Sequence, residues 1–171
     1  MLHLIENHIF KFLAIFTKDA YALKLVYKVR IGKKCRLNKN NYGSEPYLLK
    51  FGDFVSAINV DFVTHDGAVW VFRQKEPRIE LLKSINIGSN VFIGTKSIIL
   101  PGSNIGSNVI IGAGSVVKGQ IASGFVYAGV PAKKICTIDE FFTKNKDDFS
   151  MTKLMKYNEK RKYILKFLNK K

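Results

Sequence analysis

His65 is the side chain of this sequence best suited to acid–base chemistry near neutral pH. It is followed directly by Asp66, and Asp61 lies four positions before it. An imidazole can take the proton of a hydroxyl group and later return it to a leaving group. A nearby carboxylate, from Asp66 or Asp61, could orient the ring and set its tautomer. The residues alone leave a second interpretation open, in which His65 has only a structural place at a turn.

A six-residue repeat in residues 85–122 indicates the elements that must position this histidine. A β-branched residue recurs at every sixth position: Ile87, Ile93, Ile99, Ile105, Ile111 and Val117. The next positions are Gly88, Gly94, Leu100, Gly106, Gly112 and Lys118, and the positions three after each are Asn90, Lys96, Gly102, Asn108, Gly114 and Gln120. Glycine and asparagine tolerate left-handed backbone conformations. Each hexad is therefore predicted to be a short strand followed by a turn.

A repeat this short cannot bury its own apolar side chain and must stack on copies of itself. Three hexads closing one triangular coil is the simplest solution, with the Ile/Val column along the axis of a prism. A β-sandwich, the alternative, would place its turns 8–12 residues apart, which does not match a period of six. We therefore predict an all-β core in the form of a parallel β-helix.

The repeat extends toward the N-terminus with interruptions. It first occurs at Ile31, and Phe51, Ala57 and Val63 are in step with it. Turn-rich residues predict loops at 40–50 and 70–84. Apolar spacings of three and four predict helices at residues 1–28, ending one segment near Phe16 and adding another at 19–27. We predict a helical cap at 1–28, the β-helix at 29–136, and a basic helical extension at 137–171 with helices beginning at Thr137 and at 152–169.

Charge and cysteine content exclude several classes of protein. The net charge of +15 is concentrated in the two ends of the chain, since residues 51–136 carry eight basic and five acidic side chains. No nucleic-acid motif accompanies it, so we expect no nucleic-acid partner. The basic tail could pack on a neighbouring subunit, which we favour, or lie on an anionic membrane. Cys35 and Cys136 fit no metal-ligand spacing and indicate free thiols. With no signal peptide evident, we expect a cytoplasmic protein, with the inner face of the membrane as a variant of this location.

The hexads, followed by Gly129-Val130-Pro131-Ala132-Lys133, resemble the hexapeptide-repeat acyltransferases. That resemblance implies a left-handed β-helix assembled as a homotrimer. The stretches at 43–48, 62–67 and 69–73 are similar to the short sugar O-acetyltransferases of capsule, exopolysaccharide and lipopolysaccharide synthesis. The resemblance therefore implies transfer of an acetyl group from acetyl-CoA to a sugar hydroxyl, with His65 as the base.

Further site residues follow from the resemblance by position. It implies that coenzyme A lies in a groove between adjacent prisms and meets Gly94, Thr95, Ala113, Gly114, Lys118, Lys133 and Lys134. The glycines have a purely structural interpretation as corner residues, and Lys118-Gly119-Gln120 departs from the Thr-Lys-Asp of many relatives. The acceptor candidates are Ser44, Glu45, Trp70 and Arg73. A loop tryptophan is as often a packing anchor as a sugar platform.

Other functions of the same fold stay open. One is an N-acetyltransferase of a nucleotide-linked amino sugar, although many of those carry an extra nucleotide-binding domain. Another is a β-helix scaffold without catalysis, against which Thr64-His65-Asp66 and the Gly-Val-Pro-Ala segment argue. A zinc hydratase would need three histidine ligands around the metal. Because His65 is the only histidine of the repeat region, we expect no metal.

Overall fold

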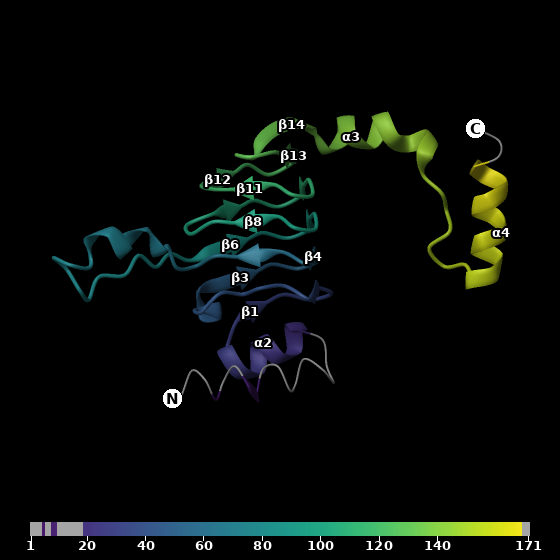
Figure 1. Ribbon diagram of the computed structural model, residues 1–171. Coiled ribbons are helices and arrows are strands. Elements are labelled where there is room, and N and C mark those ends of the chain that lie inside the picture. Colours follow the sequence, from purple (N-terminus) through teal and green to yellow (C-terminus); the bar gives the residue numbers. More distant parts are fainter. Residues whose placement is uncertain (1–4, 6–7, 10–18, 169–171) are drawn as a thin grey trace. The chain divides into compact units, whose positions relative to one another are not determined.

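Stacked triangular coils form the centre of the chain (Figure 1). The computed structural model describes residues 5, 8, 9 and 19–168. Short strands alternate with corners, and nearly all strand pairs are parallel. The chain is a left-handed parallel β-helix with helices at both ends, as predicted. It divides into two compact units, residues 1–138 and 139–171.

Three sheets make the faces of the prism. Sheet 1 contains β1 (Arg30–Ile31), β3 (Leu49–Phe51), β6 (Ile85–Ile87), β9 (Asn104–Ile105) and β12 (Gln120–Ile121). Sheet 2 contains β2 (Arg36–Asn38), β4 (Val55–Ile58), β7 (Val91–Ile93), β10 (Val109–Ile111), β13 (Phe125–Ala128) and β14 (Lys133–Thr137). Sheet 3 contains β5 (Asp61–Phe62), β8 (Ile98–Ile99) and β11 (Val116–Val117). We call the junction of sheets 1 and 2 corner 1, that of sheets 2 and 3 corner 2, and that of sheets 3 and 1 corner 3.

The predicted Ile/Val column fills the axis of the prism. Ile87 pairs with Ile105, Ile93 with Ile111, and Ile99 with Val117, each 18 residues apart. These six side chains are at most 4% exposed. Because side chains alternate between faces along a strand, one residue of each strand points into the axis while its neighbours point outward.

The predicted turn positions adopt left-handed backbone conformations at five of six hexads. Asn90, Lys96, Gly102, Asn108 and Gly114 have φ between 55° and 81°. The prediction is wrong at Gln120, which lies in strand β12. Gly119 takes the left-handed place there, with φ 79°, because the last passage round corner 3 is shortened and Ile121 pairs with Ile105 only 16 residues away.

The prediction that Val63 is in step with the repeat is also wrong. Phe62 pairs with Ile99 and is fully buried, whereas Val63 is partly exposed. Only five residues separate Ala57 from Phe62, and a shift of one residue moves a side chain to the other face of a strand. The phase returns at β6, because Phe51 pairs with Ile87 exactly as the 36-residue spacing predicted.

Residues 64–84, which we call the arm, leave the prism at corner 3 between β5 and β6 (Figure 1). The arm contains the 3₁₀ helix η2 (Gly67–Phe72). It begins before Trp70, where the sequence predicted the loop. A second excursion at this corner contains η1 (Pro46–Leu48), within the loop predicted at 40–50.

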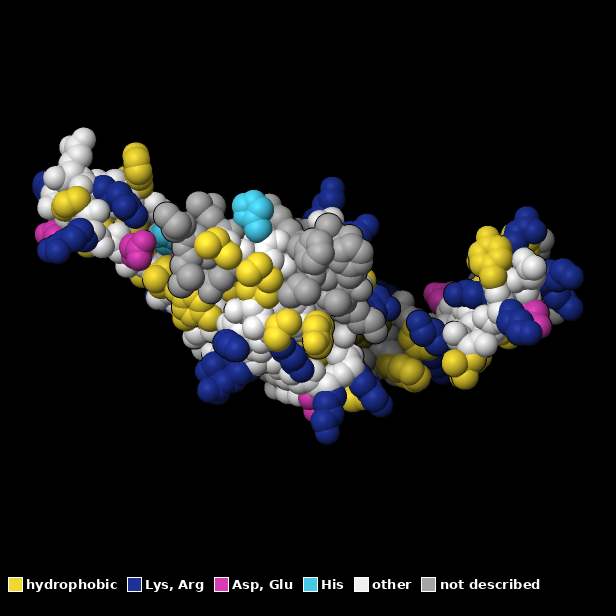
Figure 2. All heavy atoms as spheres, turned by 90° about the horizontal axis from the view of Figure 1, so that it is seen from below, with side chains coloured by type: hydrophobic (Ala, Val, Ile, Leu, Met, Phe, Trp, Pro, Cys, Tyr) yellow, Lys and Arg dark blue, Asp and Glu magenta, His cyan; other side chains and the backbone are white. Residues whose placement is uncertain are grey.

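The N-terminal end of the prism is covered by α2 (Asp19–Tyr27), as predicted for these residues. Ala22, Leu23 and Tyr27 are buried, and α2 packs against β1 and β2. The helix predicted to end near Phe16 lies outside the described residues, apart from residues 5, 8 and 9. Lys and Arg side chains are spread over the face seen in Figure 2 and do not form one patch there.

The C-terminal unit continues from α3 (Ile138–Asn145), which follows Thr137 as predicted. The 3₁₀ helix η3 (Lys146–Asp148) comes next, and α4 covers Tyr157–Leu168. Helix α4 begins later than predicted, because 152–155 forms turns. Leu154, Tyr157 and Leu168 are more than half exposed. None of the helices in the described part of the chain has the length and apolar character needed to cross a lipid bilayer.

The β8 strand offers a direct test of the axial column. Ile99 is 0% exposed and Ile98, its neighbour, is partly exposed. Ile99→Ala should lower the free energy of unfolding by about 2–5 kcal/mol, since it removes buried methyl groups and leaves a cavity. Ile98→Ala is the matched control and should cost about 1 kcal/mol or less. Urea unfolding at one protein concentration measures both, and equal losses would contradict the assigned register.

Candidate functional site

A pocket of about 240 Å³ lies at corner 3, where the arm leaves the prism. Its lining includes His65, Asp66, Lys83, Leu100, Pro101 and Lys118. These residues come from the base of the arm and from corner 3 of the next two coils. The coils therefore bring together residues more than fifty positions apart in the sequence.

His65 is held in place by the backbone at the base of the arm. The amide of Asp66 donates to the carbonyl of Leu81 at 2.8 Å, and the amide of Lys83 donates to the carbonyl of Thr64 at 3.0 Å. His65 thus forms an antiparallel bridge with Leu82. Its Nε2 atom is buried and has no hydrogen-bond partner among the described residues. Such an atom is uncommon in folded proteins and is often part of a functional site.

The Asp66 carboxylate makes a hydrogen bond that the sequence did not predict. Its Oδ1 atom accepts from the amide of Ala68 at 3.0 Å and so caps the first turn of η2. Asp61 lies in β5 and its backbone pairs with Asn41. For both carboxylates, the role of orienting His65 stays a prediction.

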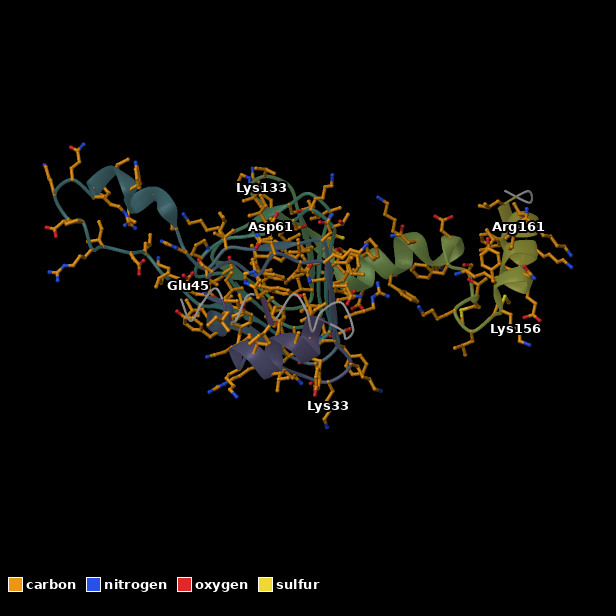
Figure 3. All side chains as sticks on the ribbon, turned by 60° about the horizontal axis from the view of Figure 1, so that its bottom comes forward. Lys33, Glu45, Asp61, Lys133, Lys156 and Arg161 are labelled. Carbon is orange, nitrogen blue, oxygen red and sulfur yellow. The ribbon has the colours of Figure 1, made fainter. Side chains whose placement is uncertain are left out.

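The predicted acceptor residues Ser44 and Glu45 also lie at corner 3. Oγ of Ser44 donates to Oε2 of Glu45 at 2.8 Å, and Oγ1 of Thr64 donates to the same oxygen at 3.3 Å. Thr64 is fully buried and directly precedes His65. The loop at 40–50 is therefore tied to the segment that carries the histidine, and Figure 3 shows Glu45 on the side of the prism from which the arm projects.

Trp70 and Arg73 lie further out along the arm. Neither lines the pocket around His65. Trp70, Val71 and Phe72 are 76%, 73% and 57% exposed. The Nε atom of Arg73 is buried without a hydrogen-bond partner in the described part of the chain. Within one chain, the structure does not bring these two predicted acceptor residues to the histidine.

The predicted cofactor residues Gly94, Thr95, Ala113 and Gly114 stack at corner 2. The amide of Gly114 donates to the carbonyl of Thr95 at 2.9 Å. A Cβ atom added to Gly94 would overlap the backbone of Ala113, so this glycine is required by the stacking alone. A Cβ atom added to Gly114 would meet nothing within 4 Å. Ala113 is likewise exposed, so the backbone of this coil is open to a ligand.

The predicted basic cofactor residues are divided between two places. Lys133 pairs with Ala128 in β14, at the C-terminal end of the corner 2 stack, and is exposed. Nζ of Lys134 lies 4.3 Å from the ring centroid of Phe125. Lys118 instead lines the pocket of His65 at corner 3.

Sequence reasoning missed Lys83, Leu100 and Pro101 as site residues. Leu100 and Lys118 are 18 residues apart, and they stand where the other four hexads have glycine. Breaks in the glycine series at the spacing of one coil were therefore the available signal for the pocket. Lys83 carries no comparable signal, because its place depends on how the arm folds back.

No group of three or more His, Cys, Asp or Glu side chains that could hold a metal ion occurs among residues 5, 8, 9 and 19–168. Both cysteines are free thiols.

The chain has clear relatives among known proteins. Residues 84–119 match the family profile described as "Bacterial transferase hexapeptide (six repeats)". The chain is 48% identical over 141 residues to "Protein CapG" of Staphylococcus aureus, covering 80% of this chain and 82% of that protein.

Solved structures agree with this match. A maltose O-acetyltransferase from Clostridium difficile 630 superimposes with a TM-score of 0.58 at 27% identity, over 80% of this chain and 88% of that one. A galactoside acetyltransferase in complex with coenzyme A gives a TM-score of 0.57 at 25% identity, over 81% and 76% of the two chains. Coils, corner pocket and sequence identity agree, and the chain belongs to the hexapeptide-repeat acyltransferases.

Proposed function

We propose that this enzyme transfers the acetyl group of acetyl-CoA to a sugar hydroxyl, in the synthesis of a surface polysaccharide. The observation that carries the proposal is the buried, unpartnered Nε2 atom of His65 in the corner 3 pocket. Two relatives of similar fold are named for acetyl transfer to carbohydrates, maltose and a galactoside. Acetyl-CoA is made in the cytoplasm, so we place the reaction there.

In this mechanism, Nε2 of His65 takes the hydroxyl proton as the acceptor oxygen attacks the thioester carbonyl. The new C–O bond forms, the C–S bond breaks, and the proton passes from the imidazole to the leaving thiolate. The arm base holds the ring through the backbone bonds of Thr64 and Asp66. An aligned base lowers the barrier because no reorganisation is needed during proton transfer.

Corner 2 supports binding of coenzyme A along the stacked backbone of Thr95, Ala113 and Gly114, with Lys133 toward the phosphates. In one chain, however, corner 2 and the His65 pocket lie on opposite edges of sheet 3. A complete site therefore needs corner 3 of one subunit beside corner 2 of another. This need supports the proposed homotrimer, as do the exposed apolar side chains of the arm. In such an assembly the arm could bring Trp70 and Arg73 to a neighbouring acceptor site.

The C-terminal unit keeps its proposed role of packing on a neighbouring subunit. The exposed Tyr157, Leu165 and Leu168 of α4 support this proposal. Contact with an anionic membrane is the alternative for the same basic helix.

His65→Gln should lower kcat by two to four orders of magnitude, the usual contribution of a general base. The amide of glutamine fits the site but cannot accept the proton. Acetyl-CoA binding and the oligomeric state should stay unchanged, because the histidine makes no contact in the axis of the prism. Thiol release from acetyl-CoA, calorimetric binding and light scattering measure the three properties. Retained turnover would remove His65 as the base.

Asp66→Asn should keep most of the activity, because an asparagine oxygen can still accept from the Ala68 amide. Asp66→Ala loses the cap, and we expect it to lower the free energy of unfolding by about 1 kcal/mol and to reduce turnover by loosening the arm. Paired kinetics and thermal unfolding of the two variants test this. If Asp66→Asn loses activity as severely as His65→Gln while its stability stays normal, the carboxylate orients the imidazole instead.

Gly114→Asn should raise the KM for acetyl-CoA at least several-fold, since the new side chain would stand where the proposed cofactor approaches the backbone. Asparagine tolerates the left-handed conformation, as Asn90 and Asn108 show. Gly124→Asn is the matched control at corner 1, where the backbone is also left-handed and the surrounding space open.

Acetyl-CoA should raise the melting temperature of the wild type and the control more than that of Gly114→Asn. No thermal shift of the wild type at millimolar acetyl-CoA would favour the scaffold interpretation.

A further inference from the structure

Two lysines line the pocket of His65. Lys83 comes from the end of the arm, and Lys118 from corner 3 between β11 and β12. Glycine at position 102 leaves room for Lys83, because a Cβ atom added there would come within 3.1 Å of Lys83 Cδ. Both side chains are exposed to solvent, so their ammonium groups are free to meet a ligand in the pocket.

These two cations exceed the negative charge of the pocket. Asp66 is the only acidic side chain that lines it, and its Oδ1 atom already accepts the Ala68 amide. Among the described residues, the structure shows no ion pair for Lys83 or Lys118. Lysines in one pocket repel each other unless an anion lies between them, so the pocket favours a ligand that carries negative charge.

The rest of the lining suits a sugar ring. Leu81, Leu100 and Pro101 supply apolar surface for the C–H face of the ring. A volume of about 240 Å³ corresponds to roughly eight water molecules at about 30 Å³ each. That space is of the order of one sugar residue, placed beside the imidazole that takes its proton.

Coenzyme A phosphates are the other possible source of negative charge. In a thioester of coenzyme A, the whole pantetheine arm separates the acyl group from the diphosphate. Cations that share a pocket with the catalytic base therefore lie at the acyl end. Lys133, at the end of the corner 2 stack, is better placed for phosphates. The charge in this pocket thus points to the acceptor.

We propose that the acceptor is an acidic sugar, whose carboxylate or phosphate lies between Lys83 and Lys118 while its hydroxyl meets His65. This inference rests on the proposed acetyl transfer and specifies its substrate class. Each lysine acts as a point charge on the acceptor and takes no part in proton transfer.

The test compares neutral hexoses with their uronic acids and 6-phosphates in the gluco, galacto and manno series, at saturating acetyl-CoA. For the preferred sugar, kcat/KM should be at least about ten-fold higher for an acidic form than for the neutral hexose. The preference should shrink as salt is raised, since exposed charges are screened. The uronic acid and phosphate arms identify which anion the two lysines accept.

Lys83→Met and Lys118→Met keep the length of the side chain and remove its charge. Each should lose most of the preference by raising the KM for the acidic acceptor, with the KM for acetyl-CoA unchanged. Lys33→Met is the matched control, because Lys33 is an exposed lysine at corner 1, away from the pocket (Figure 3). It should keep the wild-type preference.

Three results would overturn the inference. Equal use of neutral and acidic sugars by the wild type would show that the lysines do not select charge. A raised KM for acetyl-CoA in both pocket variants, with the acceptor preference intact, would assign the lysines to the phosphates of coenzyme A. Both of these leave acetyl transfer in place. If no sugar of the panel releases coenzyme A with the wild type, the proposed function fails and this inference fails with it.

Discussion

Backbone hydrogen bonding between successive coils is the constraint on which the rest of the structure depends. Each strand of two to four residues pairs with the strand above and below it, so a residue keeps the same face and corner through the stack. The buried column of Ile and Val side chains enforces this alignment, because a shift by one residue would turn the apolar side chain outward. A side chain at a corner is thereby placed as firmly as one in the core, although it is exposed. That combination suits a site which must be rigid and reachable at once.

The chemistry lies where the repeat is broken. The chain shortens by one residue between Ala57 and Phe62, which turns Val63 outward and buries Thr64. The arm then leaves the prism with His65 in the paired backbone at its base. In the two following coils, Leu100 and Lys118 replace glycine at the same corner. A regular hexad buries one side chain and turns, so only an irregular one can present a functional group here.

The sequence predicted the fold because a period of six residues with β-branched side chains has few other solutions. It predicted His65 because no other histidine lies in the repeat. It also placed Ser44 and Glu45 near that segment, and the hydrogen bond between Thr64 and Glu45 agrees with this. The cap made by Asp66 and the position of Lys83 could not be predicted, because both depend on how the arm folds and no periodicity governs the arm. Val63 and Gln120 were misplaced for a related reason, since a shortened segment shifts the phase without changing the residue types around it.

The same alignment also limits what one chain can do. Corners are fixed to the edges of sheet 3, so the open backbone at Ala113 and Gly114 and the imidazole of His65 cannot approach each other by any local movement of a loop. Bringing them together within one chain would require breaking the coil pairing that holds the prism. Association of copies needs no such change, because neighbouring prisms can place different corners side by side. A rigid β-helix with its reactive groups on separate edges is therefore complete as a fold and incomplete as a catalyst, and assembly is the least costly way to join the two halves of its site.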